Sequence, residues 1–210
     1  MNADAEGHSG AVDPAQSPEG SSAADDFVPS ALGTREHWDA VYERELRTFQ
    51  EYGDTGEICS AELVKHGFSN ITGIDYSPSA IKLSASILEK EGLSNINLKV
   101  EDFLNPSTKL SGFHVCVDKG TYDAISLNPD NAVEKRKQYV MSLSRVLEVK
   151  GFFLITSCNW TKAELLDAFS EGFELFEELP TPKFSFGGRS GNTVTALVFQ
   201  KRETSLDKIS

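Results

Sequence analysis

Three aspartates stand where apolar runs of the sequence end, and their carboxylates are the first candidates for chemistry. Asp75 follows residues 71–74, Asp102 follows the run 96–100 after one glutamate, and Asp118 follows residues 113–117. Each of these short runs predicts a β-strand. Because ligands of open α/β sheets bind beyond the carboxyl ends of the strands, we expect the three side chains to face one binding crevice.

Two interpretations of these aspartates compete. In the functional one, Asp75 accepts hydrogen bonds from both hydroxyls of a ribose, and Asp102 lies beside an adenine with Phe103 against the ring. Asp118 then faces the reacting group. In the structural one, each aspartate is a turn or cap residue, a common use of Asp after a strand. Three in succession at strand ends favour the functional interpretation.

Strands and helices alternate along the part of the chain that must position these carboxylates. The predicted helices cover residues 34–52, 77–90, 131–149 and a short stretch after residue 161, and the predicted strands cover 71–74, 96–100, 113–117 and 151–156. Ser77 is expected to cap the second helix, with Pro78 in its first turn. Two pairs, Asn131 with Glu134 and Thr161 with Glu164, predict capping boxes. The alternation predicts an α/β fold with a doubly wound, mostly parallel sheet.

The chain closes with a different pattern. Residues 173–179 and 193–199 read as two strands, joined by a loop that holds Gly187, Gly188 and Gly191. This pattern predicts a long antiparallel hairpin. A terminal hairpin and the lack of Gly-x-Gly-x-x-Gly argue against a nicotinamide-dependent dehydrogenase.

Three stretches together resemble a known family. They are residues 32–42 (Leu-Gly-Thr-Arg-Glu-His-Trp-Asp-Ala-Val-Tyr), 73–77 (Gly-Ile-Asp-Tyr-Ser) and 118–123 (Asp-Lys-Gly-Thr-Tyr-Asp). From about residue 27 to 201 the chain resembles the methyltransferase-like proteins that modify lysine on translation elongation factor 1-alpha. The resemblance implies a class I, Rossmann-like, seven-stranded fold, S-adenosylmethionine as methyl donor and a lysine of the elongation factor as acceptor. It also implies that Asp75 holds the ribose, that Asp102 lies by the adenine and that Asp118 lies beside the methyl group.

Lysine methylation requires a neutral amine, because the protonated form has no lone pair to attack a sulfonium methyl. The ordinary lysine pKa is about 10.4, and burial lowers it. Carboxylates and carbonyl groups can then orient the amine. We expect Asp118, Tyr122 and Asn159 to serve as these orienting residues.

Aromatic residues flank the expected cofactor position. Tyr76 follows Asp75 directly and is expected to contact the cofactor. Trp38 and Tyr42 fall on one face of the first predicted helix. They either cover the cofactor and line the lysine channel, or pack in the core, as aromatics at helical spacing commonly do. The pattern alone leaves both interpretations open.

One part of the expected fold has no counterpart in the sequence. The first strand and its glycine-rich turn should precede the Asp75 strand, yet residues 53–67 contain no apolar run. Gly53 and Gly56 do not form that turn, since no strand precedes them. The family pattern breaks between about residues 57 and 61, with a gap on the order of 30 residues, a helix and a strand with their turns. We interpret this as a deletion, through alternative splicing or a mis-assembled transcript.

The deletion predicts a weakened domain. About five buried side chains of a central strand contribute roughly 10 kcal/mol, close to the whole net stability of a domain. The flanking strands would also lose a ladder partner and become edges. Two functions stay open: a lysine methyltransferase with impaired activity, and a non-catalytic isoform that binds the protein partner only.

Composition narrows the remaining choices. The chain has 210 residues and a formal net charge of -12, which argues against general nucleic-acid binding. Residues 1–26 are acidic and poor in large apolar side chains, so disorder is expected there, with the domain at 27–201 and a tail at 202–210. No apolar run is long enough to span a membrane. Three cysteines and four histidines show no ligand spacing, so we expect no metal site. Unpaired cysteines are typical of a reducing compartment, so we expect the chain in the cytoplasm, with the nucleus as a second location. We also expect a monomer.

Overall fold

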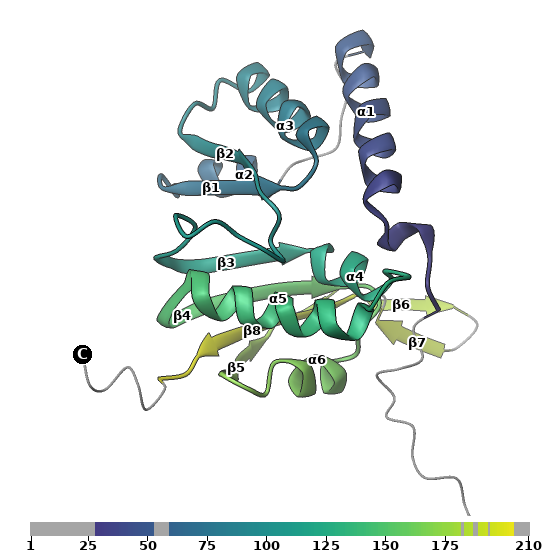
Figure 1. The fold of residues 1–210 in the computed structure, drawn as a ribbon, viewed down its shortest axis with the longest axis vertical. Coiled ribbons are helices and arrows are strands. Elements are labelled where there is room, and N and C mark those ends of the chain that lie inside the picture. The colour runs from purple at the N-terminus through teal and green to yellow at the C-terminus, as the bar shows by residue number, and fades with distance from the viewer. Residues whose placement is uncertain (1–27, 53–58, 182, 187–188, 193, 204–210) are drawn as a thin grey trace, which may run out of the picture.

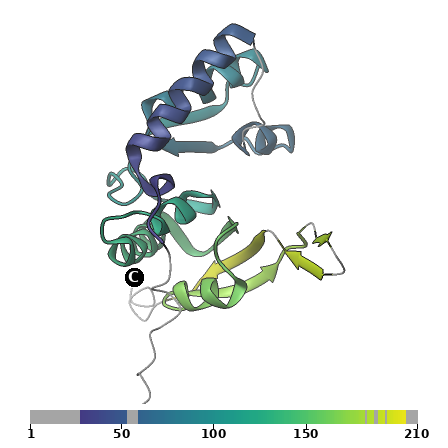
Figure 2. The same ribbon diagram turned by 90° about the vertical axis from the view of Figure 1, so that its right-hand side faces the viewer.

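The computed structural model describes residues 28–52, 59–181, 183–186, 189–192 and 194–203. The strands within these ranges form two separate sheets and a small hairpin. The predictions for residues 1–26, for Gly53 and Gly56 and for residues 204–210 lie outside the described residues. Figures 1 and 2 show one unit, with α1 and α3, stacked on a second that holds the larger sheet.

The first unit is built on a parallel pair of strands. β1 (Ile71–Asp75) pairs with β2 (Ile96–Val100), and the register runs from Ile71 opposite Ile96 to Asp75 opposite Val100. The crossover between them is α3 (Pro78–Lys90). Ser77 caps this helix, with Pro78 in its first turn, so that prediction is confirmed. The helices α1 (Arg35–Tyr52) and α2 (Cys59–Lys65) precede β1.

The second unit contains a four-stranded sheet in the order β3-β4-β8-β5. β3 (Phe113–Lys119) is parallel to β4 (Leu147–Ser157), whereas β8 (Thr195–Lys201) is antiparallel to both β4 and β5 (Phe173–Glu178). The β5–β8 pairing confirms the predicted terminal hairpin. A short hairpin, β6 (Lys183–Phe186) with β7 (Arg189–Asn192), lies between these strands and was not predicted.

Three helices cover one face of this sheet and enclose an aromatic core. They are α4 (Thr121–Ser126), α5 (Ala132–Val146) and α6 (Lys162–Ala168). The core is a continuous cluster of buried side chains, among which the aromatic ones are Tyr122, Tyr139, Phe153, Trp160, Phe169, Phe173 and Phe199. Elsewhere on the sheet, Val115 and Val117 of β3 keep 53% and 41% of their surface exposed. The second unit is therefore well packed beneath its helices and open along β3.

Two local predictions in this unit need correction. The capping box predicted at Asn131 is wrong: this residue has a φ of 56°, and its side chain makes no cap hydrogen bond. The helix also ends at Val146 rather than near residue 149, because Leu147 already has extended backbone and pairs with Phe113. The capping box of Thr161 with Glu164 is confirmed in both directions.

The two sheets are not joined through their facing strands. Within the described part of the chain, β1 pairs only with β2, and β3 pairs only with β4. The expected single doubly wound sheet is thus divided between the Asp75 strand and the Asp118 strand. This division confirms the prediction that the strands beside the deletion lose a ladder partner.

Loop contacts connect the units instead. The 3₁₀ turn η2 (Ala31–Gly33), just before α1, lies against the end of α4: the Ser30 N–H donates to the Leu127 carbonyl at 3.0 Å, and Asn128 Nδ2 donates to the Gly33 carbonyl at 2.5 Å. A Cβ atom at position 33 would stand 2.2 Å from the Leu127 carbonyl carbon, so only glycine fits this approach. After β2, the loop docks on α5, where Arg145 Nη2 donates to the Pro106 carbonyl at 2.6 Å.

Candidate active site

Asp75 ends β1 as predicted, at the turn that leads into α3. Its Oδ1 atom accepts the Ser77 N–H at 2.8 Å, and Ser77, which is fully buried, in turn caps α3. Burial raises the pKa of Asp75, the Ser77 hydrogen bond opposes this, and the negative charge of Asp39 raises it further. A half-buried carboxylate at a strand end is suited to accept ligand hydroxyl groups.

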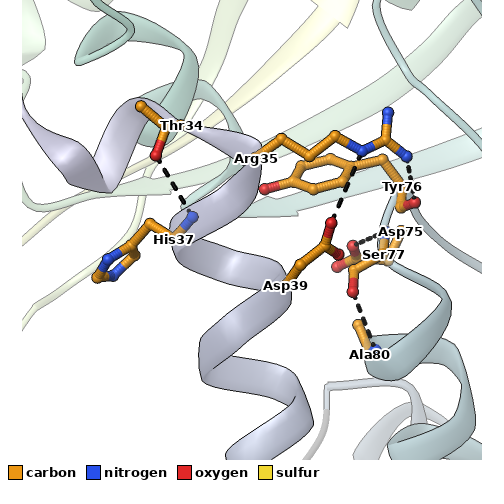
Figure 3. Close-up of polar contacts among 8 residues, drawn as sticks. All are labelled: Thr34, Arg35, His37, Asp39, Asp75, Tyr76, Ser77 and Ala80. Carbon is orange, nitrogen blue, oxygen red and sulfur yellow. Dashed lines mark hydrogen bonds and ion pairs between the residues drawn. The ribbon is translucent and has the colours of Figure 1, made fainter.

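The start of α1 packs against this turn (Figure 3). Arg35 Nη2 donates to the Tyr76 carbonyl at 2.8 Å, and its guanidinium lies 4.9 Å from the centre of the Tyr76 ring. Arg35 Nε also lies 3.9 Å from Asp39 Oδ2. Arg35 and Asp39 were not among the predicted site residues, although both belong to the 32–42 stretch that carries the family resemblance.

Trp38 and Tyr42 lie on the side of α1 that faces this cluster. The Trp38 indole N–H donates to the Leu32 carbonyl at 2.6 Å, and the Trp38 and Tyr42 rings lie 6.1 Å apart. Burial, with a further contribution from the Asp75 charge, raises the pKa of Tyr42 to about 12. Both aromatics remain partly exposed, and α1 has no buried residue. This exposure favours a site-lining position over core packing.

Asp102 and Phe103 follow β2 as expected, but they differ in what they contact. Asp102 is exposed, and its Oδ1 accepts the Leu104 N–H at 2.9 Å, which is the pattern of a turn residue. The Phe103 ring packs edge-on against Tyr139 at 5.0 Å between centroids. Phe103 therefore anchors the loop to the second unit, and its contact with an adenine stays a prediction.

Asp118 is 5% exposed and uses both carboxylate oxygens within the protein. Oδ1 accepts the Thr121 N–H at 2.8 Å, while Oδ2 accepts the Tyr122 N–H at 3.1 Å and the Tyr139 hydroxyl at 2.5 Å. Burial raises the pKa of Asp118, and these hydrogen bonds oppose the rise. This geometry makes Asp118 a cap of α4. A direct contact between Asp118 and the reacting amine stays a prediction.

Tyr122 and Asn159, the other predicted orienting residues, have contrasting environments. Tyr122 is buried in the aromatic core, 5.4 Å from Trp160 between ring centroids. Asn159 is exposed, two residues after the end of β4, and its backbone N–H donates to Ser157 Oγ at 3.1 Å. The described contacts do not bring the two side chains together, and their roles stay predictions.

Asp123 is a residue of this region that the sequence interpretation missed. Its carboxylate accepts the Ser157 hydroxyl at 2.5 Å and the Cys158 N–H at 2.9 Å, which ties α4 to the carboxyl end of β4. The signal was present, since Asp123 closes the quoted stretch 118–123. Spacing alone could not show that it reaches across to the next strand.

Neither a metal-binding cluster nor a membrane-spanning helix occurs among the described residues. Among the described residues, no group of three or more His, Cys, Asp or Glu side chains is arranged to hold a metal ion. Within the described residues there is also no helix of sufficient length and apolar character to cross a membrane.

Comparisons with known proteins agree with this geometry. The methyltransferase domain family matches residues 55–202. EEF1A lysine methyltransferase 2 of Mus musculus is 83% identical over 244 positions that cover all of both chains. The Homo sapiens protein of the same name is 68% identical and covers 96% of this chain and 100% of its own. The solved structure of the N-methyltransferase NodS from Bradyrhizobium japonicum, in complex with S-adenosyl-L-homocysteine, has a TM-score of 0.53 and 15% identity over 69% of this chain and 73% of its own.

The mouse alignment also bears on the length of the chain. It spans 244 positions and includes all 210 residues here, so 34 positions (244 minus 210) have no counterpart in this chain. That number agrees with the gap of about 30 residues expected before β1. The full-length similarity and the split class I fold lead to one conclusion: the chain belongs to the methyltransferase domain family and, within it, to the EEF1A lysine methyltransferase 2 family of protein-lysine methyltransferases.

Proposed function

We propose that this chain is an S-adenosylmethionine-dependent protein-lysine N-methyltransferase, that its substrate is translation elongation factor 1-alpha, and that its missing segment weakens it. The observation that carries the proposal is the 83% identity, over the whole of both chains, to a protein named for this activity. The class I fold and the carboxylate at the end of β1 support it.

The residues present fit one end of the cofactor. Asp75 offers a half-buried carboxylate for ribose hydroxyls, and Trp38 and Tyr42 lie beside it as partly exposed aromatic surfaces. Bound there, S-adenosylmethionine supplies a methyl group on a sulfonium. The methionine end normally rests on the glycine-rich turn before the Asp75 strand. The described residues between α1 and β1 contain only α2, and we propose that this end of the site is poorly supported.

For the lysine end, the second unit supplies a rigid wall. The buried Asp118 network fixes the start of α4, and Asp123 fixes α4 against the end of β4. A lysine side chain that enters between these elements leaves water, which lowers its pKa and favours the neutral amine. Asn159, exposed at the same strand end, is our candidate for orienting that amine.

Charge and cysteine content support a proposal for the partner and the compartment. The net charge of -12 supports a protein partner rather than nucleic acid, because nucleic-acid binding requires a cationic surface. Cys59, Cys116 and Cys158 carry no disulfide, which fits a reducing compartment. We place the chain in the cytoplasm or nucleus as a monomer.

A non-catalytic role is the second candidate, and the split between β1 and β3 is the observation that favours it. A chain that keeps its second unit but binds the cofactor weakly would still recognise the elongation factor without modifying it.

One experiment separates the two candidates. Purified chain is incubated with unmethylated elongation factor 1-alpha and S-adenosylmethionine, and lysine methylation is read by mass spectrometry. The proposal predicts transfer that Asp75→Ala abolishes, at a rate well below that of a chain carrying the missing segment. Co-purification of the two proteins with no transfer would establish the non-catalytic role instead.

A further inference from the structure

The polar cluster at the start of α1 contains a second carboxylate that no sequence signal singled out. Asp39 projects from α1 toward the turn that carries Asp75 (Figure 3). The two carboxylates come from different elements, the helix α1 and the strand β1. They are near enough for the charge of Asp39 to raise the pKa of Asp75, after burial, which is the larger cause.

Asp39 has an incomplete set of partners. Its Oδ1 atom is buried and accepts no hydrogen bond, although the side chain as a whole is 37% exposed. Its Oδ2 atom lies 3.9 Å from Arg35 Nε, too far for a hydrogen bond. A buried oxygen of a charged group is costly to leave without a donor, so a water, an ion or a ligand is expected to supply one.

Arg35 forms a long ion pair with Asp39, and its positive charge lowers the pKa of Asp75, but its hydrogen bond is made elsewhere. Its Nη2 atom donates to the Tyr76 carbonyl at 2.8 Å, and its guanidinium stacks over the Tyr76 ring. Arg35 thereby holds α1 against the β1–α3 turn. It leaves Asp39 and Asp75 facing one another with one donor, the Ser77 N–H, on Asp75.

Two adjacent carboxylates, of which Asp39 has a buried oxygen without a donor and Asp75 has one donor, match a ligand with two neighbouring hydroxyl groups. Each hydroxyl donates one hydrogen bond, so a vicinal diol serves both acids at once and relieves their repulsion. We propose that Asp39 is a second acceptor for the ribose hydroxyls of the cofactor, paired with Asp75 across the α1–β1 contact, and that Arg35 positions α1 for this purpose. The proposal rests on the function proposed above.

The test measures binding rather than turnover. The unsubstituted chain, Asp39→Asn and the control Glu43→Gln, an exposed acid one turn further along α1, are titrated with S-adenosylhomocysteine by calorimetry. We expect Asp39→Asn to weaken binding about tenfold or more, as loss of a charged hydrogen-bond acceptor does, and Glu43→Gln to leave it unchanged. Titration with the 2′-deoxy and 3′-deoxy analogues then identifies the hydroxyl: its removal should cost affinity in the unsubstituted chain and little in Asp39→Asn.

The outcomes separate the two claims. If the unsubstituted chain binds S-adenosylhomocysteine and Asp39→Asn binds equally well, the role of Asp39 is overturned while the proposed function stands. If the unsubstituted chain does not bind at all, both fail. A thermal melt without ligand adds a second criterion. Asp39→Asn should melt at the same or a higher temperature because it removes a repulsion, whereas a clearly lower melting temperature would show that Asp39 only supports α1.

Discussion

The two units of this chain differ in how they are stabilised and in what they contribute. The second unit has four strands and an aromatic core between β4, β8 and three helices. The first has two strands, with the buried face of α3, Ala80, Leu83, Ile87 and Leu88, as its main packing. A pair of strands is marginal by itself. Stability therefore resides mainly in the second unit, while Asp75, which we propose holds the cofactor ribose, lies in the first.

The deletion that we propose before β1 would account for this asymmetry. A strand between β1 and β3 would give both edges a ladder partner and join the two-stranded and four-stranded sheets into one sheet of seven strands. Without it, the units are held together by η2 against α4 and by the loop after β2 against α5. We therefore expect the proposed cofactor site to lie in the least stable part of the molecule.

The largest expected effect tests whether the units unfold separately. Phe153→Ala removes a core side chain of the second unit and should cost about 3–5 kcal/mol, enough to unfold most of the chain. Leu88→Ala, its counterpart in the first unit, should open only that unit. Urea unfolding followed by far-UV circular dichroism checks this. Equal loss of the whole signal in both variants would contradict the separation of the units.

The next effect concerns the buried Asp118 network. Tyr139→Phe deletes the hydroxyl that donates to Asp118 Oδ2 and should cost about 1.5–3 kcal/mol, since it leaves a buried charge with fewer donors. Chemical denaturation measures the loss. Tyr122→Phe, in the same core, is the control for a hydroxyl that makes no such bond to Asp118. No difference between the two variants would show that Asp118 is not held by Tyr139.

Gly33→Ala tests the contact that bridges the units. The added Cβ meets the Leu127 backbone, so η2 must move away from α4, at a cost of about 1–3 kcal/mol. We expect α1 to become sensitive to limited trypsin digestion at Arg44 and Arg47 while the second unit stays protected. The control Ala40→Gly lowers helix propensity within α1 by about 1 kcal/mol without touching the bridge. Equal trypsin sensitivity in both variants would show that the contact of η2 with α4 does not hold the two units together.

The smallest effect is a pH dependence at Asp75. Its pKa is raised in the folded chain, so the folded state binds the proton more tightly than the unfolded state does. Protonation therefore favours folding, and stability falls as the pH rises through the window that begins at the ordinary value of 3.8. Asp75→Asn should raise the melting temperature slightly at pH 7 and not at pH 3.5. The exposed Asp130→Asn should show no such difference, and a gain for Asp75→Asn only at low pH would reverse the sign.

The helices and strands that were predicted correctly are those whose position is determined by local sequence signals. Ser77 with Pro78 and Thr161 with Glu164 mark helix starts whatever the surroundings, and the apolar runs before Asp75 and Asp118 identify strands. The capping box predicted at Asn131 was wrong because this residue has a left-handed backbone, with a φ of 56°, and its side chain makes no cap hydrogen bond. The predicted helix end near residue 149 was wrong because Leu147 pairs with Phe113 in the sheet, and this pairing overrides the helical pattern of the sequence.

The sequence predicted which site residues lie at strand ends, but it did not predict the contacts that their side chains make. The apolar runs of the sequence place Asp75 and Asp118 at strand ends. Only the structure shows that both carboxylate oxygens of Asp118 accept hydrogen bonds from α4 and Tyr139. Arg35, Asp39 and Asp123 act through partners far away in the sequence, namely Tyr76, Asp75 and Ser157. No spacing rule reports such long-range pairs.

Hydrogen exchange tests the division of the molecule most directly. Backbone amides of β1 and β2 should exchange much faster than those of β4 and β8, because the first unit can open without the second. S-adenosylhomocysteine should slow exchange in β1 and at the start of α3, where Asp75 and Ser77 lie, and leave the second unit unchanged. Equal protection across both units, with no local effect of the ligand, would contradict the two-unit structure and the placement of the cofactor carboxylate on its weaker half.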